Sequence, residues 1–442
     1  MAEIAPFRGI LYAPSAGDPS QLLAPPYDVI SDEERRALEA RDPHNCVRLI
    51  LPQPEPGEED DSKYSRAATT LKSWIDDKTL QRDAEPALYR YHQEFSVDNV
   101  PVVRKGFIAR IRLARFDEGV VLPHERTLSG PKVDRLKLMR ASRTHFSQIF
   151  GLYSDKDRKT DEPFASLEKT PPALVGSTSD GVTHRLWRLT DRAAIAEVAR
   201  FLQGEKVYIA DGHHRYETML ALREELRPGI RPEVGARSAA EYGVMFFCNL
   251  DDPGLVVFAT HRVLYGLPTF DRASFLQRSR EFFTVTEGPM ADPAVVKRAL
   301  GGYVKRGPTV ALVCPGHDRI AYLRVRGDLI VSSVPAMAGP KVLAELDVAL
   351  LHGLVFETLL GIDRAAQEKQ THLRYVKDWQ KAFAELSQPG VQGVFLMNPT
   401  PVKQVKAVAD AGEVMPQKST FFYPKIASGL VINPIDPNEI VE

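Results

Sequence analysis

Apolar and polar positions over the first 265 residues predict strands and helices within one folded region. Residues 86–97 and 100–116 carry aromatic and β-branched residues with partial alternation, and Asp98 and Asn99 lie between them. This pattern is typical of a β-hairpin closed by a tight turn. Residues 206–226 follow with a short apolar run, a polar turn and a helical pattern. The alternation of strands and helices predicts an α+β fold.

Shorter patterns define the N-terminal elements. Ser31 is followed three residues later by Glu34, which predicts a capping box for a helix over 32–41. The apolar spacing over 64–77 predicts a second helix. Residues 45–52 form a nearly continuous apolar run, and we expect a buried strand there.

The pattern of predicted helices and strands changes near residue 268. Short strands are predicted over 308–316 and 319–325, and a long apolar helix over 341–362, with a break at Gly353. Residues 242–250 and 254–266 are predicted to be paired strands. We therefore expect a catalytic α+β domain over 1–265, a smaller α/β domain over 266–390, and a segment over 391–442 that returns to the first domain.

Composition changes this picture little. The chain has 442 residues, 43% hydrophobic and 26% charged, with a formal net charge of −1. This balance gives no electrostatic drive toward nucleic acid, so none is expected as a partner. Cys46, Cys248 and Cys314 lie far apart, which argues against a disulfide framework or a cysteine zinc site. We expect no signal peptide and no membrane span, and a cytoplasmic location.

The turn after the apolar run at 207–210 concentrates polar side chains. Asp211, Gly212, His213, His214 and Arg215 are consecutive, between the predicted strand and the predicted helix. Glycine permits an unusual backbone conformation, and the first-turn amides of a helix attract anions. Asp211 is compatible with a metal ligand, a general base or a simple helix cap. Because adjacent side chains point in different directions, we expect only one histidine to reach a ligand.

A second polar group follows residue 122. Glu125 is predicted to be a general base, and His124 a substrate contact, because loop residues at a strand end can reach a cleft. Lys132 and Arg135 are predicted to bind phosphate oxygens. The same motif contains Arg126, Thr127 and Asp134. A polar loop followed by a charged helix face is the alternative interpretation.

Two further segments carry candidate residues. Lys418, Ser419 and Thr420 resemble the end of a phosphate-binding loop, but the preceding glycine pattern is missing, so the Walker interpretation fails. They remain candidates for contact with a phosphate or a substrate, or an ordinary turn. Asp28, after Pro25 and Pro26, and Arg48 are candidate substrate contacts; for Asp28 a plain turn residue is the alternative.

The motif "ADGHHRYETML" resembles the signature turn of the ParB and sulfiredoxin superfold, in the variant found in free-serine kinases. The whole chain is similar to the family catalogued as domain of unknown function 1015. Four motifs carry this similarity in order: "LLAPPYDVIS", "LPHERT" with "KVDRL", "ADGHHRYET" and "MPQKSTFFYPKIASGL". The resemblance implies a mixed-sheet core, a nucleotide bound at the helix after Gly212, and transfer of a phosphoryl group from ATP or ADP to L-serine.

Together these features predict a phosphotransferase for a small hydroxyl compound, with free L-serine favoured. Glu125 or Asp211 would take the hydroxyl proton, and Arg215, Lys132 and Lys418 would stabilise the transferred charge. Mg²⁺ is expected from this chemistry, with Asp211 as its candidate ligand. Two alternatives stay open: a ParB-like nucleotide-binding or nucleotide-hydrolysing regulatory protein, and a non-enzymatic scaffold.

Overall fold

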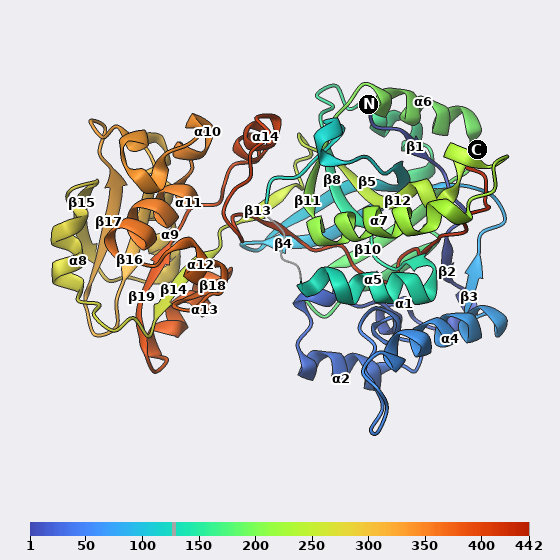
Figure 1. Cartoon of the computed structure of the whole chain (residues 1–442), viewed down its shortest axis with the longest axis horizontal. Coiled ribbons are helices and arrows are strands. Elements are labelled where there is room, and N and C mark those ends of the chain that lie inside the picture. The colour runs from blue at the N-terminus through green and yellow to red at the C-terminus, as the bar shows by residue number, and fades with distance from the viewer. Residues whose placement is uncertain (126–129, 442) are drawn as a thin grey trace. The chain divides into compact units, whose positions relative to one another are not determined.

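The computed structural model describes residues 1–125 and 130–441, and the chain divides into two compact units (Figure 1). Unit 1 comprises Met1–Pro123, Thr127–Val256 and Pro424–Glu442. Unit 2 comprises His124–Arg126 and Val257–Tyr423. The chain therefore passes from unit 1 to unit 2 after Val256 and returns at Pro424, whereas the sequence suggested boundaries near 265 and 390.

Unit 1 is built on a nine-stranded mixed sheet. Its strands run in the order β6-β11-β8-β12-β5-β4-β10-β9, and β1 pairs with β5. Only the β6–β11 and β8–β12 pairs are parallel in this sheet. Their bounds are β6 Val121–Leu122, β11 Val207–Asp211, β8 Ile149–Tyr153, β12 Tyr242–Asn249, β5 Val100–Arg112, β4 Leu88–Val97, β10 Thr183–Leu189, β9 Leu174–Ser177 and β1 Ile4–Ala5. The predicted α+β class with a mixed sheet is confirmed.

The predicted hairpin is confirmed as β4 and β5. The two strands pair antiparallel from Val97 and Val100 onward. Asp98 and Asn99 take φ values of 50° and 64°, which is the left-handed backbone that such a two-residue turn requires. Asparagine and aspartate tolerate this region better than other non-glycine residues, so the turn follows directly from the dipeptide.

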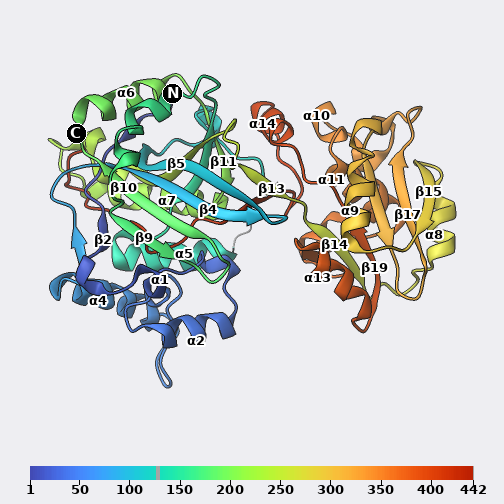
Figure 2. The ribbon, with the colours of Figure 1, turned by 180° about the vertical axis from the view of Figure 1, so that it is seen from behind.

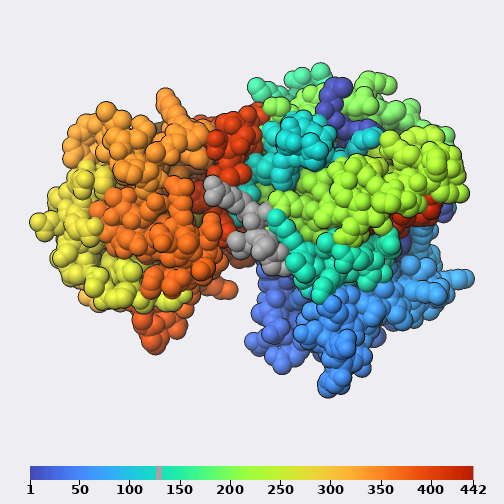
Figure 3. Space-filling model, viewed as in Figure 1, coloured from blue at the N-terminus to red at the C-terminus, as the bar shows by residue number. Residues whose placement is uncertain are grey.

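Helices cover one side of this sheet. The helices α5 (Gly130–Ser142) and α7 (His213–Leu226) pack against each other, and α4 (Ser62–Asp76) packs on α5 (Figure 1). In the space-filling view α5 and α7 lie side by side (Figure 3). From the opposite side, β4, β10 and β9 come into view (Figure 2). The remaining helices of unit 1 are α1 Pro19–Leu22, α2 Asp32–Arg41, α3 Val47–Ile50 and α6 Arg192–Gln203.

Two N-terminal predictions have different outcomes. Helix α2 begins with the expected capping box, because the Ser31 side chain accepts from the Glu34 amide and the Glu34 side chain accepts from the Ser31 amide. The strand predicted over 45–52 is wrong, because the chain forms the short helix α3. The Asn45 side chain accepts the Val47 amide and starts this turn. Val47, Leu49 and Ile50 are all buried, so packing overrides their strand preference.

Unit 2 contains a six-stranded antiparallel sheet in the order β15-β17-β16-β19-β14-β18. The bounds are β15 Phe283–Pro289, β17 Arg319–Val325, β16 Thr309–Val313, β19 Val391–Leu396, β14 His261–Tyr265 and β18 Leu373–Val376. The strands predicted over 242–250 and 254–266 do not pair with each other. β12 lies between β5 and β8 in unit 1, and β14 lies between β19 and β18. The backbone hydrogen bonds of β12 and β14 are made with strands that are distant in the sequence, and the short connection between β12 and β14 does not form a hairpin.

The helices of unit 2 include an irregular one. The predicted helix 341–362 divides into α10 (Lys341–Ala344), α11 (Asp347–Leu350) and a π-helix over Leu351–Leu359. The break lies at Glu345 and Leu346, whereas Gly353 lies inside the π-helix. The others are α8 Arg272–Ser279, α9 Pro293–Gly301, α12 Arg364–Glu368, α13 Trp379–Ala384 and α14 Val402–Asp410. Among the described residues, no helix has the length and apolar character that crossing a membrane requires.

Candidate functional site

The turn between β11 and α7 has the geometry that the sequence predicts. Gly212 follows the strand with φ 92° and ψ 27°, a left-handed conformation that favours glycine. A Cβ atom at this position would lie 3.1 Å from the Arg215 guanidinium. Helix α7 then begins at His213, and no side chain of Gly212 can cap it. No side chain of the N-cap residue accepts a hydrogen bond from the first backbone amides of this 14-residue helix. Such amides at the positive end of a helix dipole suit the binding of an anion.

Asp211 is held between two cations. Its Oδ2 atom lies 2.6 Å from Nη2 of Arg215, and its Oδ1 atom accepts a hydrogen bond from Nζ of Lys425. Burial alone would raise the pKa of Asp211, but Lys425 and then Arg215 outweigh it and hold the pKa well below its usual range. Arg215 and Lys425 therefore favour the ionised form of Asp211, which contacts both cations and is disfavoured as a proton acceptor.

Arg215 is buried and has a second hydrogen-bond partner besides Asp211. It is 4% exposed, and its Nη1 atom donates to the main-chain oxygen of Gln148. His213 is buried, and its electrostatic interaction with Asp211 favours the ionised form of that carboxyl, whereas His214 is half-buried on the same first turn. The different burial of the two histidines fits their divergent directions.

Tyr27 connects this turn with two other predicted residues. The guanidinium of Arg135 lies over its ring at 4.1 Å. Burial raises the pKa of Tyr27, and the nearby charges of Arg215, Asp28, Arg135 and Asp211 act on the same hydroxyl. The charged groups at positions 28, 135, 211 and 215 thus gather around one phenol in unit 1. Asp28 itself is exposed in the short 3₁₀ turn Tyr27–Val29.

The remaining predicted cations of unit 1 have protein partners. Nζ of Lys132 forms an ion pair with Glu217 and thereby joins α5 to α7. Arg135 also donates from Nε to Asp134 at 2.8 Å and from Nη1 to the oxygen of Ile50. Arg48 lies on α3 and donates from Nη2 to the oxygen of Glu39 at 2.8 Å. These contacts give Lys132 and Arg48 a structural role in the packing of helices.

A second group of predicted residues meets in unit 2. Nε2 of buried His124 lies 2.9 Å from Oγ1 of Thr420, although 296 positions separate them. Oε1 of Glu125 accepts the backbone amide of Lys418 at 2.9 Å. Lys418 has φ 55°, so the carboxylate supports a left-handed turn. His124 and Glu125 of "LPHERT" therefore contact Thr420 and Lys418 of "MPQKST".

The rest of this second group is positioned by its own loop. The Ser419 hydroxyl donates to the main-chain oxygen of Pro416. The main-chain oxygen of Ser419 accepts a hydrogen bond from the Thr400 hydroxyl at 3.1 Å. Ser419 and Thr420 are buried, whereas Lys418 is exposed. Arg126 and Thr127 of the "LPHERT" motif lie outside the described residues.

Comparison with known proteins identifies the family. A family model described as a protein of unknown function (DUF1015) matches residues 4–349, which is well over half of the chain. The chain belongs to the DUF1015 family. This confirms the resemblance carried by the four sequence motifs. Among curated proteins, none matches the chain.

Solved structures show similarity to this DUF1015 chain at low identity. A mutant of free serine kinase in complex with AMP is 13% identical, with a TM-score of 0.36, over 72% of this chain and 87% of that chain. A conserved hypothetical protein from Pyrococcus furiosus is 14% identical, with a TM-score of 0.33, over 76% and 94%. SbnI with a C-terminal truncation, from Staphylococcus aureus, is 13% identical, with a TM-score of 0.34, over 73% and 85%.

Two residues of the DUF1015 site were not predicted. Lys425 lies within the quoted "MPQKSTFFYPK" segment, but no local pattern connects it with Asp211, 214 positions away. Gln148 is 1% exposed, and its Nε2 atom donates to the oxygen of Val431. Its Oε1 atom has no hydrogen-bond partner among residues 1–125 and 130–441.

Proposed function

We propose that this DUF1015 protein is a phosphotransferase that uses ATP or ADP and transfers a phosphoryl group to a small hydroxyl compound, with free L-serine as the acceptor. One observation carries the proposal: the N-terminus of α7, which lacks a capping side chain, begins beside Arg215 and Lys425, and both cations are oriented by Asp211. The resemblance of "ADGHHR" to the turn of free-serine kinases supports the choice of acceptor.

The residues at this turn fit the phosphates of a nucleotide. Phosphates bind where backbone amides point outward and the helix dipole is positive. Gly212 leaves room for such an approach, because a side chain there would occupy the space next to the Arg215 guanidinium. His214 is half-buried on the first turn and can donate to the same anion.

The cations have the role that phosphoryl transfer requires. Negative charge on the transferred group is stabilised by cations held in advance, so that no reorganisation is needed during the reaction. Asp211 provides this order, because it fixes Arg215 and Lys425 from opposite carboxylate oxygens. We therefore assign Asp211 a positioning role and not the role of a base.

The acceptor hydroxyl must lose its proton to a carboxylate. Within unit 1, Asp28 is exposed and follows Tyr27 in the sequence, and the charges of Arg215 and Asp211 act on the Tyr27 hydroxyl. We therefore propose Asp28, a candidate substrate contact in the sequence, as a proton acceptor within unit 1. Glu125, the general base predicted from sequence, accepts a hydrogen bond from the Lys418 amide and stays a second candidate proton acceptor.

Mg²⁺ does not fit Asp211 in this arrangement. Both carboxylate oxygens already contact cationic side chains, and a metal ion would have to displace one of them. The described part of the chain also contains no group of three or more His, Cys, Asp or Glu residues that could hold a metal. We therefore derive no step through a metal ion.

Nucleotide binding and turnover test the proposal separately. Calorimetry with ATP and ADP should show binding by the full-length chain and weaker binding by Gly212→Ala. Gly229→Ala is a matched control, because a Cβ atom there meets no neighbour within 4 Å and its φ is not left-handed. Turnover should then produce ADP from ATP, or AMP from ADP, with L-serine and not with L-alanine, which lacks the hydroxyl.

The outcomes distinguish the three candidate functions. Nucleotide binding without serine-dependent turnover would indicate a regulatory nucleotide-binding protein. No binding of either nucleotide would indicate a scaffold. If turnover occurs but Asp28→Asn and Glu125→Gln both retain it fully, neither carboxylate is the proton acceptor.

A further inference from the structure

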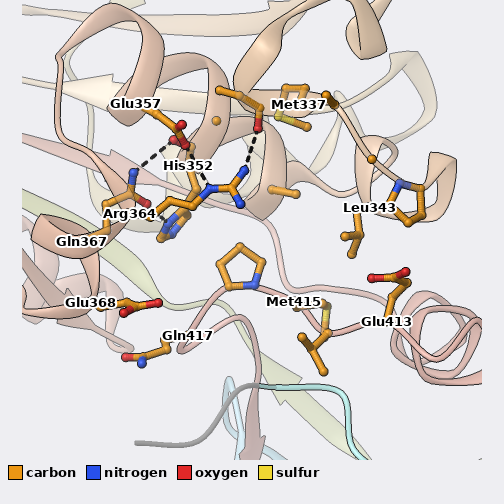
Figure 4. Close-up of a pocket in the computed structure, with 18 of the residues that line it drawn as sticks. Met337, Leu343, His352, Glu357, Arg364, Gln367, Glu368, Glu413, Met415 and Gln417 are labelled. Atoms are coloured by element: carbon orange, nitrogen blue, oxygen red, sulfur yellow. Dashed lines mark hydrogen bonds and ion pairs between the residues drawn. The ribbon is translucent and has the colours of Figure 1, made fainter.

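Unit 2 contains a cavity of about 270 Å³ that uses none of the residues assigned to phosphoryl transfer. Its walls come from the segment 336–343, the π-helix, α12, Tyr375 on β18, and the loop 413–417 that follows α14 (Figure 4). Met337, Leu343, Pro340 and Met415 supply much of the apolar surface. Methionine side chains adapt their shape, so this wall can follow an aliphatic ligand.

The π-helix shapes one wall of the cavity. Such helices are rare, and they occur frequently at functional sites. Gly353 lies within it, and a Cβ atom at this position would come within 2.2 Å of Sδ of Met337. The absence of a side chain lets Met337 pack against the helix backbone. The wall is therefore closed by tight packing.

The buried polar groups of this wall are satisfied within the protein. Nδ1 of His352 lies 2.7 Å from Oε1 of Gln367, and Nε2 accepts from Nε of Arg262 at 3.3 Å. Burial, together with the charge of Arg262, lowers the pKa of His352 to about 3, so the ring is neutral. The Gln367 amide nitrogen donates to the oxygen of Ile362 at 2.7 Å. His352 and Gln367 therefore present neutral groups to the cavity, and the charged Arg262 of this network is not among the described residues that line it.

Among the charged side chains that line the cavity, two glutamates have no ion-pair partner in the described part of the chain. Nε of Arg364 lies 3.3 Å from Oε2 of Glu357, so these two residues compensate each other. Glu368 and Glu413 form no ion pair or side-chain hydrogen bond with residues in the described ranges 1–125 and 130–441. In Figure 4, Glu368 lies beside Gln417 on one side of the cavity, and Glu413 lies on the other side.

We propose that this cavity binds a linear aliphatic diamine or polyamine. Two ammonium groups joined by a methylene chain match two carboxylates on opposite sides of an apolar surface in both charge and polarity. One ammonium would pair with Glu368 and donate a hydrogen bond to the Gln417 amide oxygen. The other would pair with Glu413, and the methylene groups would lie against Met337, Leu343 and Met415.

Calorimetry on the full-length chain tests this assignment with four probes. These are 1,5-diaminopentane and spermidine, together with pentan-1-amine and pentane-1,5-diol, which keep the five-carbon chain and remove one or both charges. We expect 1,5-diaminopentane to bind up to about fivefold more tightly than pentan-1-amine, which is the upper range for one solvent-accessible ion pair. Binding should weaken as salt is added, because salt screens exposed charges.

Substitutions locate the site. Glu368→Gln and Glu413→Gln should each weaken 1,5-diaminopentane binding about fivefold, and the double variant should bind it no better than wild type binds pentane-1,5-diol. Glu281→Gln is the matched control, because Glu281 is an exposed glutamate of unit 2 outside this cavity. It should bind the diamine like wild type. Thermal unfolding without ligand verifies that each variant is folded.

Three results would overturn the proposal. The first is equal affinity for 1,5-diaminopentane and pentane-1,5-diol. The second is wild-type diamine affinity in the folded Glu368→Gln, Glu413→Gln double variant. The third is an equal loss in Glu281→Gln, which would indicate attraction to the general surface charge. Each result is independent of nucleotide binding at α7, so this inference and the proposed function can fail separately.

Discussion

The Asp211→Asn substitution isolates the charge that orders the α7 turn. Asparagine has almost the same shape as aspartate, but it cannot compensate the charges of Arg215 and Lys425. The side chains of Asp211, Arg215 and Lys425 are 17%, 5% and 14% exposed, so solvent screens these pairs only weakly. The substitution therefore leaves two largely buried cations without a countercharge.

The expected magnitude follows from this burial. Removing one partner of a buried ion pair costs about 3–5 kcal/mol, because the remaining charge stays desolvated. At roughly 2–4 °C per kcal/mol for a domain of this size, the unfolding midpoint of unit 1 should fall by about 6–20 °C. Asp117→Asn is the matched control, because Asp117 pairs with Arg115 at 3.0 Å and both side chains are more than half exposed. We expect no measurable shift in that variant.

The pH dependence provides a second readout. The folded pKa of Asp211 lies below its unfolded value of about 3.9, so its stabilising contribution is fully present above that value. The contribution is lost as the pH falls through the folded pKa. Thermal unfolding followed by circular dichroism should therefore show a constant deficit for Asp211→Asn between pH 5 and 8, and a smaller deficit below pH 4. A deficit no larger than that of Asp117→Asn would refute the role of Asp211 as a buried counterion.

Three further predictions concern separate elements. Asn99→Val should destabilise unit 1 by roughly 1–2 kcal/mol in urea unfolding, because valine resists the left-handed φ of 64°, whereas Asn99→Gly should not. Glu125→Ala should lower the unfolding free energy of unit 2 by about 0.5–1.5 kcal/mol through loss of the bond from the Lys418 amide, and Glu125→Gln should retain it. The pKa of His352 is about 3 in the folded protein, so below pH 6.5 this side chain binds more protons in the unfolded state than in the folded state. Stability should thus fall by up to about 1.4 kcal/mol per pH unit below that pH, and His352→Gln should reduce this slope in pH-dependent denaturation.

Local patterns were sufficient for elements whose causes lie within a few residues. The capping box at Ser31, the hairpin turn at Asp98 and Asn99, and the strand, glycine turn and helix around Gly212 all follow from neighbouring side chains. Each depends on backbone preference or on a hydrogen bond between near neighbours, so the sequence alone contains the required information.

The apolar run at 45–52 marks the limit of such patterns. Hydrophobic periodicity cannot distinguish a buried strand from a short buried helix. In the folded chain Val47, Leu49 and Ile50 lie in a short helix, and this helix buries all three side chains. The π-helix over Leu351–Leu359 is a similar case, since the contact of Gly353 with Met337 depends on a segment outside the helix.

Sequence patterns alone were enough to assign the family, the α+β class and the position of the turn between β11 and α7. The electrostatic role of each charged side chain, by contrast, depends on contacts between segments that are distant in the sequence. Lys425 reaches Asp211 across 214 positions and converts a candidate base into an anchored anion, and Thr420 reaches His124 across 296 positions. The protonation state of a carboxylate depends on its burial and on the charges beside it. Those charges come from distant segments, and no local pattern records which of them the fold brings together.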